Sequence, residues 1–428
     1  MSDLQGPGTE RRLRTAAIAV LVIVVGIAAA RFATNVARAA VRPSPCFVAH
    51  YTLARLLVHG VDLARTYDDT WFAAQTARVT PGVTDINVNP PTTALLLLPV
   101  ARLGYTDARI AWTAASLALL VATVIVLVRQ TGLGGTWALA FAALVLLYQP
   151  IAADLNFANV YLLVLALTVA AWQGYRGHDD RLLGVALALM LAIKLAGGFL
   201  WVLVLAERRW RALAWGAAGA AALVLGSLPW IGGAAWLADA ASLADAARRP
   251  ERAVTAYQSV TGLFRHLFTR DQTWNPAPLL RAPLVASVAP WVVVLVLVSV
   301  GLWVAHRHPT DDRVFAAFVI AGVVASPLAL DYTYTTLLLP IAVALAWVRR
   351  RGSPWAWAPV AAAIVPIALD LPYRSPRLTA GAWALLAYPK LAGALLLWAG
   401  LLVAASLAPR RERAARGVST VALARTEG

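Results

Sequence analysis

Apolar runs of about 17 to 25 residues recur along the whole sequence, and a run of this length is what an α-helix needs to cross the hydrocarbon core of a bilayer. Of the 428 residues, 60% are hydrophobic and 14% are charged, and no long polar stretch separates the runs. This apolar share exceeds that of ordinary soluble domains. The sequence therefore predicts an all-α polytopic membrane protein in which residues 1–428 form one integral membrane domain.

Clusters of arginine between the runs predict how the chain is threaded, because positively charged loops stay on the cytoplasmic side of a membrane. Alternation gives a bundle of about twelve spans, with a basic N-terminus (residues 1–14) and a basic tail (residues 409–428) both in the cytoplasm. The longest connections, a first outer loop over residues 41–91 and a second over residues 232–283, then lie outside together. The expected spans are 15–32, 92–103, 110–128, 137–151, 160–172, 182–206, 213–231, 285–305, 314–325, 334–348, 355–369 and 391–407.

Three of these segments allow a second interpretation. The first run also has the basic start and apolar core of a signal peptide, and we interpret it as an uncleaved span because many further spans follow. The run 92–103 is too short to cross at ordinary tilt, and can instead form a half-helix packed within protein. Residues 153–161 fall on the inner side by this count, unless the spans around them are re-entrant.

Several kinds of function are excluded by composition. The net charge of +16 is typical of nucleic-acid-binding proteins, but the basic residues here stand in short clusters between apolar runs, so we expect no nucleic-acid partner. The only cysteine, Cys46, excludes an intrachain disulfide, and a role as a small residue is its plainest interpretation. Because no metal-binding, Walker or dinucleotide motif is present, we expect neither a metal nor a cofactor.

The chain has only two lysines, Lys194 and Lys390, and Lys194 stands near the middle of an expected span. A charged side chain at that depth costs roughly 2.5 to 3.5 kcal/mol on insertion scales. Lys194 either binds an anion, such as a lipid phosphate, in a hydrated cavity or forms a structural ion pair with Asp154. Since charges within the membrane usually have a function, we favour the phosphate.

The first outer loop begins with a helical pattern and continues with carboxylates. Apolar residues recur there at helical spacing while His50 and Arg55 face elsewhere, which is typical of a helix lying flat at the membrane interface. Such a helix would hold Asp69 and Asp85 over the mouth of a cavity. Taken singly, however, each carboxylate also fits a solvated loop position.

The second outer loop combines polar, aromatic and basic side chains, among them Tyr257, Gln258, Ser259 and Arg265. Amides and aromatic rings beside arginines suit sugar hydroxyls and phosphates. An interfacial helix with snorkelling arginines has the same composition, so both interpretations stay open. The absence of a sequence-level inverted repeat argues against a secondary transporter. We therefore expect the functional site at the outer surface, in a cavity covered by the two long loops.

Six segments follow one another along the chain: "CFVAHYTLARLLVHGVDLARTYDD", "NPPTTALLLLPVARL", "ANVYLLVLALTVA", "GVALALMLAIKLAGGFLWVLVLAERRWRAL", "YQSVTGLFRHL" and "SPLALDYTYTTLLLP". In sequence and spacing they resemble glycosyltransferase family 87. The members of this family are polytopic type-C glycosyltransferases, typified by the mycobacterial polyprenyl-phosphate-mannose-dependent mannosyltransferases. The resemblance covers nearly the whole chain.

The resemblance implies transfer of a sugar, expected to be mannose, from a polyprenyl-phosphate donor to a lipid-linked or cell-envelope glycan acceptor. The reaction would proceed with inversion at the outer face of the cytoplasmic membrane of an actinobacterium, with membrane lipids as further partners. An acceptor hydroxyl would attack the anomeric carbon while a carboxylate acts as general base. Cations beside the departing phosphate would contribute most to the rate.

The family pattern assigns roles to particular residues of this chain. Lys194 matches the intramembrane lysine, and Gln258 and Ser259 match the "NQS" motif with Tyr257 in place of asparagine. Other positions depart from the pattern: Cys46 replaces the usual aspartate, Asn89 replaces the tyrosine of "YPP", and Phe157 and Ala158 replace "GQ" before Asn159. In the family's "SPxxWxH" motif, Leu330 replaces the tryptophan and Tyr332 replaces the histidine, with Asp331 between them.

The missing base leaves two classes of function open. Either another acid has taken over, with Asp331 and Asp69 as first candidates and Asp85 next, or the protein binds or assembles a lipid-linked glycan without transferring sugar. A lipid or glycan transporter is a third and weaker interpretation. For the donor phosphate we expect Lys194, Arg55 and Arg265. The residues expected to contact substrate are His50, Asn89, Asn159, Tyr257, Gln258, Ser259 and Tyr332.

Overall fold

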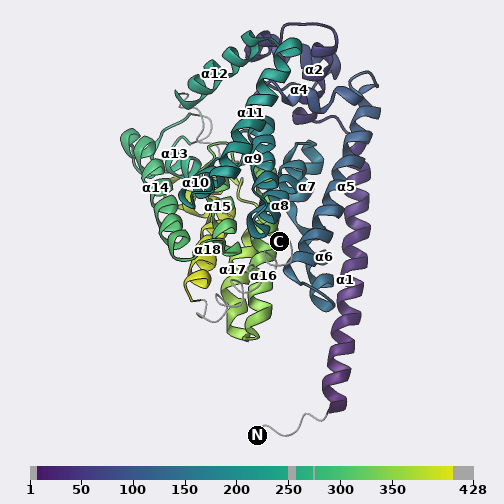
Figure 1. The fold of residues 1–428 in the computed structure, drawn as a ribbon, viewed down its shortest axis with the longest axis vertical. Helices are drawn as coiled ribbons and strands as arrows, with labels where there is room; N and C mark the ends of the chain where they lie inside the picture. Colours follow the sequence, from purple (N-terminus) through teal and green to yellow (C-terminus); the bar gives the residue numbers. More distant parts are fainter. Residues whose placement is uncertain (1–6, 249–256, 273–274, 408–428) are drawn as a thin grey trace, which may run out of the picture.

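A computed structural model describes residues 7–248, 257–272 and 275–407, and its regular structure is helical (Figure 1). The α-helices are α1 (Pro7–Val41), α2 (Pro45–Val58), α3 (Asp69–Val79), α4 (Thr93–Leu96), α5 (Tyr105–Thr131), α6 (Thr136–Leu147), α7 (Gln149–Phe157), α8 (Tyr161–Gly177), α9 (Asp180–Lys194), α10 (Gly198–Ala206), α11 (Trp210–Ile231), α12 (Gly233–Arg248), α13 (Val260–Phe268), α14 (Pro283–Arg307), α15 (Asp312–Ala325), α16 (Leu338–Arg351), α17 (Trp357–Ala368) and α18 (Pro389–Ser406). Short 3-10 helices are η1 (Leu63–Tyr67), η2 (Leu98–Val100), η3 (Asp331–Leu337), η4 (Pro354–Ala356), η5 (Pro376–Leu378) and η6 (Gly381–Ala387). The predicted tail 409–428 and residues 1–6 lie outside the described residues.

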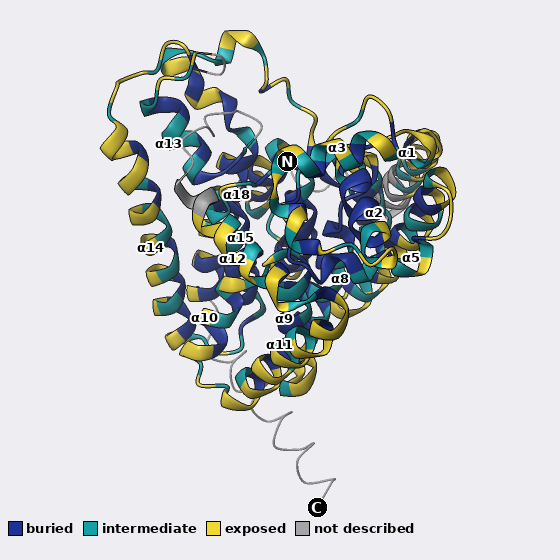
Figure 2. Ribbon diagram, turned by 90° about the horizontal axis from the view of Figure 1, so that it is seen from above, coloured by how far each residue is buried: buried dark blue, intermediate teal, exposed yellow. Residues whose placement is uncertain are grey.

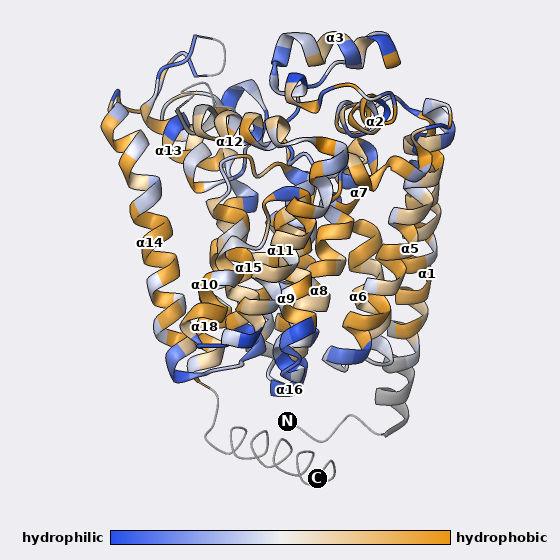
Figure 3. Ribbon diagram, turned by 45° about the horizontal axis from the view of Figure 1, so that its top comes forward, coloured by the Kyte–Doolittle hydropathy of each residue, from blue (hydrophilic) through white to orange (hydrophobic). Residues whose placement is uncertain are grey.

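Six described helices are long and apolar enough to cross a membrane, and α6 with α7 forms a seventh candidate that is bent by 45°. This confirms a polytopic all-α membrane protein, although it does not reproduce the predicted twelve spans. The apolar helices form a belt between two more polar ends (Figure 3). On α14, at the outside of the bundle (Figure 2), Leu284 and Trp291 are 74% and 75% exposed, as expected for side chains that face lipid.

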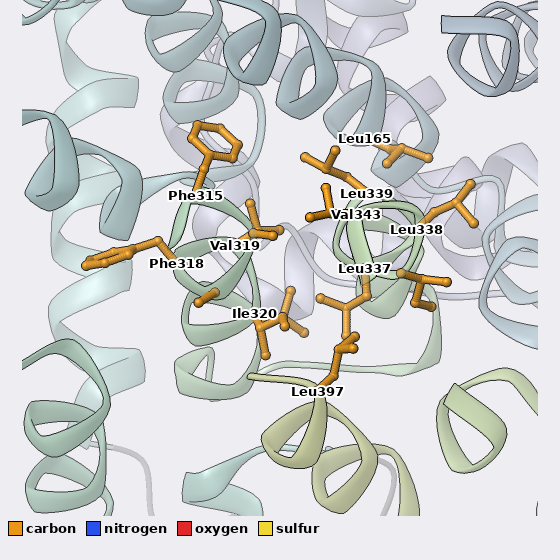
Figure 4. Close-up of a cluster of buried hydrophobic side chains, with 14 of the residues drawn as sticks. Leu165, Phe315, Phe318, Val319, Ile320, Leu337, Leu338, Leu339, Val343 and Leu397 are labelled. Atoms are coloured by element: carbon orange, nitrogen blue, oxygen red, sulfur yellow. The ribbon is translucent and has the colours of Figure 1, made fainter. Parts of the chain in front are cut away.

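The core of the bundle lies where α15, α16 and α18 pack together beside α8. Phe315, Ile320 and Leu337 are fully buried there, and Leu165 and Leu397 complete the cluster from the neighbouring helices (Figure 4). α15 has only 14 residues and is buried nearly all round. A helix that is apolar on all faces belongs in the interior of a bundle, and this one supports the chain that carries η3.

Connections at one end of the bundle are tied together by polar side chains. Tyr175 donates to Glu207 at 2.6 Å, and Glu207 also accepts the backbone N–H of Thr310 at 3.2 Å. Arg176 donates to the carbonyl of Gln130 at 2.9 Å. These bonds join the C-terminal ends of α5 and α8 and the segments that follow α10 and α14. We call this end of the bundle the basic end. The opposite end, which carries α2, α3, α12 and α13, is called the loop end (Figure 3).

The predicted span 182–206 is a helical hairpin rather than a single crossing. α9 ends at a break where Leu195 and Gly197 both have left-handed backbone, with φ of 50° and 80°. α10 then returns to the basic end, because Arg209, three residues after α10, donates to Asp180 in the first turn of α9 at 2.8 Å. The tip of the hairpin therefore lies inside the bundle and points toward the loop end.

The predicted span 92–103 does not cross either, since it forms only the short helices α4 and η2 at the loop end. Because the run 92–103 does not cross, α5 begins at the loop end and runs to the basic end. The bent pair α6 and α7 then returns, so the turn after α7 also lies at the loop end. Residues 153–161 therefore lie beside the long loops and not at the basic end, because Ser44, just before α2, donates to the carbonyl of Phe157 at 2.5 Å.

α2 differs from the predicted interfacial helix, because its residues Phe47–Ala54 are all buried. The rings of Phe47, Tyr51 and Tyr105 pack on one another with centroids 5.4 to 6.0 Å apart. Arg55 is exposed as predicted, whereas His50 is covered. The segment that leads into α4 folds back over the helix, so the face that would meet water in an isolated amphipathic helix is buried in protein.

Candidate functional site

Lys194 ends α9 at the tip of the hairpin, where its ammonium group donates to Oδ1 of Asn89 at 2.5 Å. The ammonium group also lies 5.9 Å from the centroid of the Tyr161 ring. Both contacts suit a cation, and so does the negative end of the helix dipole at the C-terminus of α9, which contributes typically 0.3–1 kcal/mol. We call this site the lysine cluster. Its members are Lys194, Asn89, Tyr161, Asn159, Cys46, His50, Asp85 and Tyr332.

The segment "NPPTT" fixes the position of Lys194 by capping the end of α9. The hydroxyl of Thr92 donates to the carbonyl of Ala192 at 2.5 Å, and that of Thr93 donates to the carbonyl of Ile193 at 2.9 Å. The last carbonyls of a helix have no partner within the helix, so these bonds stabilise its end. Prolines 90 and 91 stiffen the segment, because their φ is fixed. Asn89 is thereby brought to the ammonium group.

A second turn delivers Asn159 to the same place. α7 ends where Ala158 takes a left-handed conformation with φ of 43°. The carboxylate of Asp154 accepts the N–H groups of Tyr161 and Leu162 at 3.2 Å each, and so caps the N-terminus of α8. Lys194 is thus hydrogen-bonded to Asn89, while Asp154, its predicted alternative partner, is engaged by backbone.

Cys46 and His50 stand one turn apart on the inner side of α2. Tyr332 and Asn159 lie within hydrogen-bonding reach of the thiol, and the charge of Lys194 acts on both Cys46 and His50. Burial, helped by Asp85, raises the pKa of the Cys46 thiol to about 11. A thiol that stays protonated does not serve as a general base at neutral pH.

His50 is 3% exposed, and its Nε2 has no hydrogen-bond partner among the described residues. Burial, together with the charge of Lys194, lowers the pKa of His50 to about 3. The ring is therefore neutral at any physiological pH. A buried neutral imidazole with a free nitrogen is suited to a hydrogen bond with a hydroxyl group of a ligand.

Asp85 brings a carboxylate to the lysine cluster from the loop between α3 and α4. Its backbone N–H donates to the hydroxyl of Thr76 at 3.2 Å, and its Oδ1 accepts the N–H of Ile86 at 2.9 Å. Burial raises the pKa of Asp85, while the N–H of Ile86 and the charge of Lys194 lower it. A carboxylate with a raised pKa beside a cation is a common form of general base.

Asp331 belongs to a separate cluster on the other side of η3. Tyr373 donates to its Oδ1 at 2.5 Å, while Gln149 and Arg374 donate to its Oδ2 at 3.1 and 3.3 Å. The ammonium of Lys390, fully buried, lies 4.0 Å from Oδ1. Both oxygens of Asp331 are thus occupied, which is the pattern of a carboxylate that holds segments together.

The neighbouring Tyr332 faces the lysine cluster instead. Its ring stacks on that of Tyr161 with centroids 5.5 Å apart and contacts the ring of Phe157 edge-on at 5.6 Å. Successive residues of η3 therefore serve different clusters. Tyr332 thus lies with Cys46 and Asn159.

Gln258 and Ser259 hold α13 in place. The side-chain amide of Gln258 donates to the carbonyl of Ala387 at 2.7 Å and accepts the N–H of Lys390 at 3.3 Å. The hydroxyl of Ser259 accepts the N–H of Gly262 at 3.0 Å and caps α13. Both side chains are fully buried, so this motif fastens the second long loop to α18.

The other predicted residues lie outside the lysine cluster. Asp69 is in the first turn of α3, where the helix dipole favours a carboxylate. Arg55 lines a groove between α2 and α3 on the far side of α2. Tyr257 and Arg265, the latter on α13, are partly buried.

Sequence reasoning overlooked Tyr161, whose ring lies between Lys194 and Tyr332, and it underrated Cys46. The only signal for Tyr161 was its place two residues after Asn159. Arg109 was also missed: it is fully buried on α5 and donates to the carbonyls of Leu155 and Asn156 at 2.9 Å. These bonds hold the end of α7, and an arginine inside an apolar run was the available signal.

The fold and the lysine cluster define an integral membrane protein with a polar site below long loops at one end of its helix bundle. Residues 87–330, more than half of the chain, match the model of glycosyltransferase family 87. The chain therefore belongs to glycosyltransferase family 87 and is a membrane glycosyltransferase. The match includes Asn89, Asn159 and Lys194. No curated protein and no solved structure gives a match.

Proposed function

We propose that this protein transfers a sugar, expected to be mannose, from a polyprenyl-phosphate donor to a lipid-linked or cell-envelope glycan, with inversion at the anomeric carbon. The observation that carries this proposal is the lysine cluster, in which the ammonium of Lys194, the carboxylate of Asp85 and several neutral hydrogen-bonding groups meet at the tip of the α9–α10 hairpin. The family supports sugar transfer, and the cluster supports a phosphorylated donor.

In the proposed reaction, the donor phosphate binds beside the ammonium of Lys194, with Asn89 orienting that group. The acceptor hydroxyl attacks the anomeric carbon and gives its proton to Asp85. The bond between the anomeric carbon and the phosphate oxygen breaks, and polyprenyl phosphate leaves with its electron pair. Charge grows on the phosphate oxygen in the transition state, so a cation already in place stabilises that state more than the ground state.

Asp85 is preferred to Asp331 as the base because of the bonds that each carboxylate makes. Both oxygens of Asp331 accept hydrogen bonds from side chains, whereas Oδ2 of Asp85 has no hydrogen bond to a described residue. Asp85 is also close enough to Cys46 and Lys194 to influence their ionisation. A free oxygen next to the donor site is what a general base needs. His50, Asn159 and Tyr332 would contact sugar hydroxyls.

The arrangement of charge supports an orientation with the site outside. The connections at the basic end carry the arginine-rich segments 207–211, 306–313 and 349–351. Positively charged loops stay in the cytoplasm, so the loop end would face the outside of the cytoplasmic membrane. A donor embedded in the outer leaflet would reach the lysine cluster from there.

The test is a screen of polyprenyl-phosphate sugars with purified protein, with a membrane lipid extract as acceptor. We expect transfer of labelled mannose by the wild type and a loss of at least about a hundredfold in kcat in Asp85→Asn, since a general base contributes about 10²–10⁴. Asp62→Asn, which changes an exposed aspartate in the same loop, is the matched control. A folded protein that transfers no sugar from any such donor would leave only a binding role.

A further inference from the structure

A groove of about 300 Å³ lies between α2 and α3, apart from the lysine cluster. Its lining residues are Thr52, Arg55, Leu56, His59, Gln75, Arg78 and Val79. The volume is at the lower limit of common small-molecule sites. With two arginines and no acidic residue in its lining, the groove is positively charged.

Neither arginine is neutralised by a described residue. Arg55 donates to the hydroxyl of Tyr51 at 3.5 Å, and its guanidinium lies 5.7 Å from the centroid of that ring. Arg78 donates to Oε1 of Gln75 at 3.2 Å. In the described part of the chain, no carboxylate lies within ion-pair distance of either guanidinium. Both arginines are thus oriented by neutral groups and keep donors for an anion.

Thr52 gives a second, independent indication of a ligand. It is only 2% exposed, and its hydroxyl has no hydrogen-bond partner among the described residues. A buried hydroxyl without a partner costs roughly 1–3 kcal/mol. Thr52 is itself a lining residue of the groove, so rotation of its side chain would bring the hydroxyl to an acceptor atom of a bound molecule.

The groove and the lysine cluster lie on opposite sides of α2. At 100° per residue, Cys46 and His50 share one face, and Thr52, Arg55 and His59 lie on the other, roughly a helix diameter of 10 Å away. α3 provides the link to the proposed base. Thr76 is fully buried on α3 and accepts the N–H of Asp85, while Gln75 and Arg78 on the same helix line the groove.

We propose that this groove binds the phosphate group of a lipid phosphate ester that serves as the acceptor. This inference rests on the proposed function. The donor phosphate adjoins the reacting carbon and therefore belongs at Lys194, so a phosphate on the far side of α2 belongs to the second substrate. The arginines and Thr52 would bind the phosphate oxygens, and Leu56 and Val79 would contact the carbon atoms beside them. The acceptor hydroxyl would then reach Asp85 about 10 Å from its own phosphate.

Binding is measured on the purified full chain in a neutral detergent. The probe is dihexanoyl phosphatidic acid, a short-chain lipid phosphate, and dihexanoyl phosphatidylcholine is the zwitterionic comparison. We expect Arg55→Gln with Arg78→Gln to weaken binding of the phosphatidic acid by at least about tenfold, because two charge-assisted bonds are lost. The matched control, Arg42→Gln with Arg102→Gln, removes two exposed arginines that do not line the groove.

Thr52→Val separates binding from a structural role. Because the hydroxyl has no partner in the protein, valine leaves the unfolding temperature unchanged or raises it, while it weakens binding of the phosphatidic acid several-fold. The proposal is overturned if the Arg55→Gln/Arg78→Gln variant and the Arg42→Gln/Arg102→Gln control bind phosphatidic acid with equal affinity. It is also overturned if the wild type binds phosphatidic acid and phosphatidylcholine with equal affinity. A lower unfolding temperature of Thr52→Val with unchanged binding overturns it as well.

Kinetics identify the substrate to which the groove belongs. We expect dihexanoyl phosphatidic acid to inhibit sugar transfer in competition with the acceptor extract and not with the donor. Competition with the donor would place the probe at Lys194, and binding without inhibition would make the groove a site for bulk lipid; both results overturn the acceptor assignment. If the wild type transfers no sugar at all, the proposed function fails, and the binding measurements still decide whether the groove takes a lipid phosphate.

Discussion

The sequence offers three carboxylates as the general base, with Asp331 and Asp69 ahead of Asp85, and their surroundings in the structure reverse that order. Asp331 is held by three side chains, and Asp69 stands in the first turn of a helix. Asp85 is partly buried beside a cation and keeps one oxygen without a partner among the described residues. A proton acceptor needs a free lone pair, so the hydrogen bonds of a carboxylate tell more about its role than its position in a motif.

The pH dependence of sugar transfer should report the ionisation of Asp85. Only the carboxylate form accepts a proton, and burial raises the pKa of Asp85. The rate should therefore fall in acid, as the carboxylate is protonated, and rise with pH. The midpoint of this rise should lie above the pKa of an exposed aspartate. His50 does not titrate in this range, because its pKa is lowered to about 3. The measurement is the acid limb of kcat/KM, compared between wild type and His50→Asn.

If the acid limb disappears or shifts strongly in the His50→Asn variant, the imidazole and not Asp85 is the titrating group. A limb at the pH of an ordinary exposed aspartate would also contradict the assignment. Asp62→Asn should leave the limb unchanged, since Asp62 caps η1 and is exposed.

Part of the site could be predicted at the scale of residues. Lys194 stands out because a charged group is costly in apolar surroundings, whereas Asn89 and Asn159 are indicated by the family pattern. Tyr161 and Cys46 could not be recognised, because both residue types are common in ordinary helix interfaces. The groups that hold the site, such as Arg109, act through backbone carbonyls of segments far away in the sequence, and no local pattern reveals those contacts.

At the scale of elements, the α9–α10 hairpin sets the depth of the site. α9 has 15 residues and α11, which starts beside it at the basic end, has 22. At 1.5 Å per residue, the tip of α9 therefore lies roughly 10 Å below the end of α11. The lysine is thus recessed below the loop end, where water is restricted and a charge acts more strongly on a bound phosphate.

The cap on α9 gives a test of this element. Thr93→Val removes the hydroxyl that binds the carbonyl of Ile193 and leaves that carbonyl without its partner. We expect a loss of about 1–3 kcal/mol in the free energy of unfolding, since a buried acceptor is left unpaired. The measurement is unfolding in detergent, with the exposed Thr84→Val as control. Equal stability of the two variants would show that the cap is not needed.

The positions of the helices in the sequence could be predicted far better than whether each helix crosses the membrane. Most expected spans coincide with helices because an apolar run of sufficient length is a direct physical signal. The run 182–206 predicts one span, because Leu195 and the glycines after it break the helix without interrupting the apolar pattern. The composition of the run 92–103 predicts a span because Thr92 and Thr93, which bind the end of α9, still leave the run apolar on average.

At the scale of the whole molecule, polar groups are divided between two ends that serve different purposes. The basic end joins helices through bonds such as Arg209 to Asp180, and the loop end carries the lysine cluster. The apolar belt between them fixes the protein in the membrane (Figure 3). Orientation then decides which compartment the site faces.

Labelling from outside the cell tests that orientation. In a Cys46→Ser background, Thr84→Cys places a thiol at the loop end and Arg129→Cys places one at the basic end, both at exposed positions. We expect a membrane-impermeant maleimide to label the first variant in intact cells and the second only after permeabilisation, because the arginine-rich end should be cytoplasmic. The reverse pattern would place the site on the cytoplasmic side.

The central claim is that the ammonium group of Lys194 binds the donor phosphate. Its most direct test is the affinity of purified protein for polyprenyl phosphate, measured for the wild type, for Lys194→Ala and for Arg102→Gln as a control at an exposed arginine of the loop end. We expect Lys194→Ala to bind at least about tenfold more weakly, because a charge-assisted hydrogen bond is worth roughly 1.5–3 kcal/mol, while the control binds as the wild type does. Equal affinity of all three proteins for polyprenyl phosphate would contradict the claim.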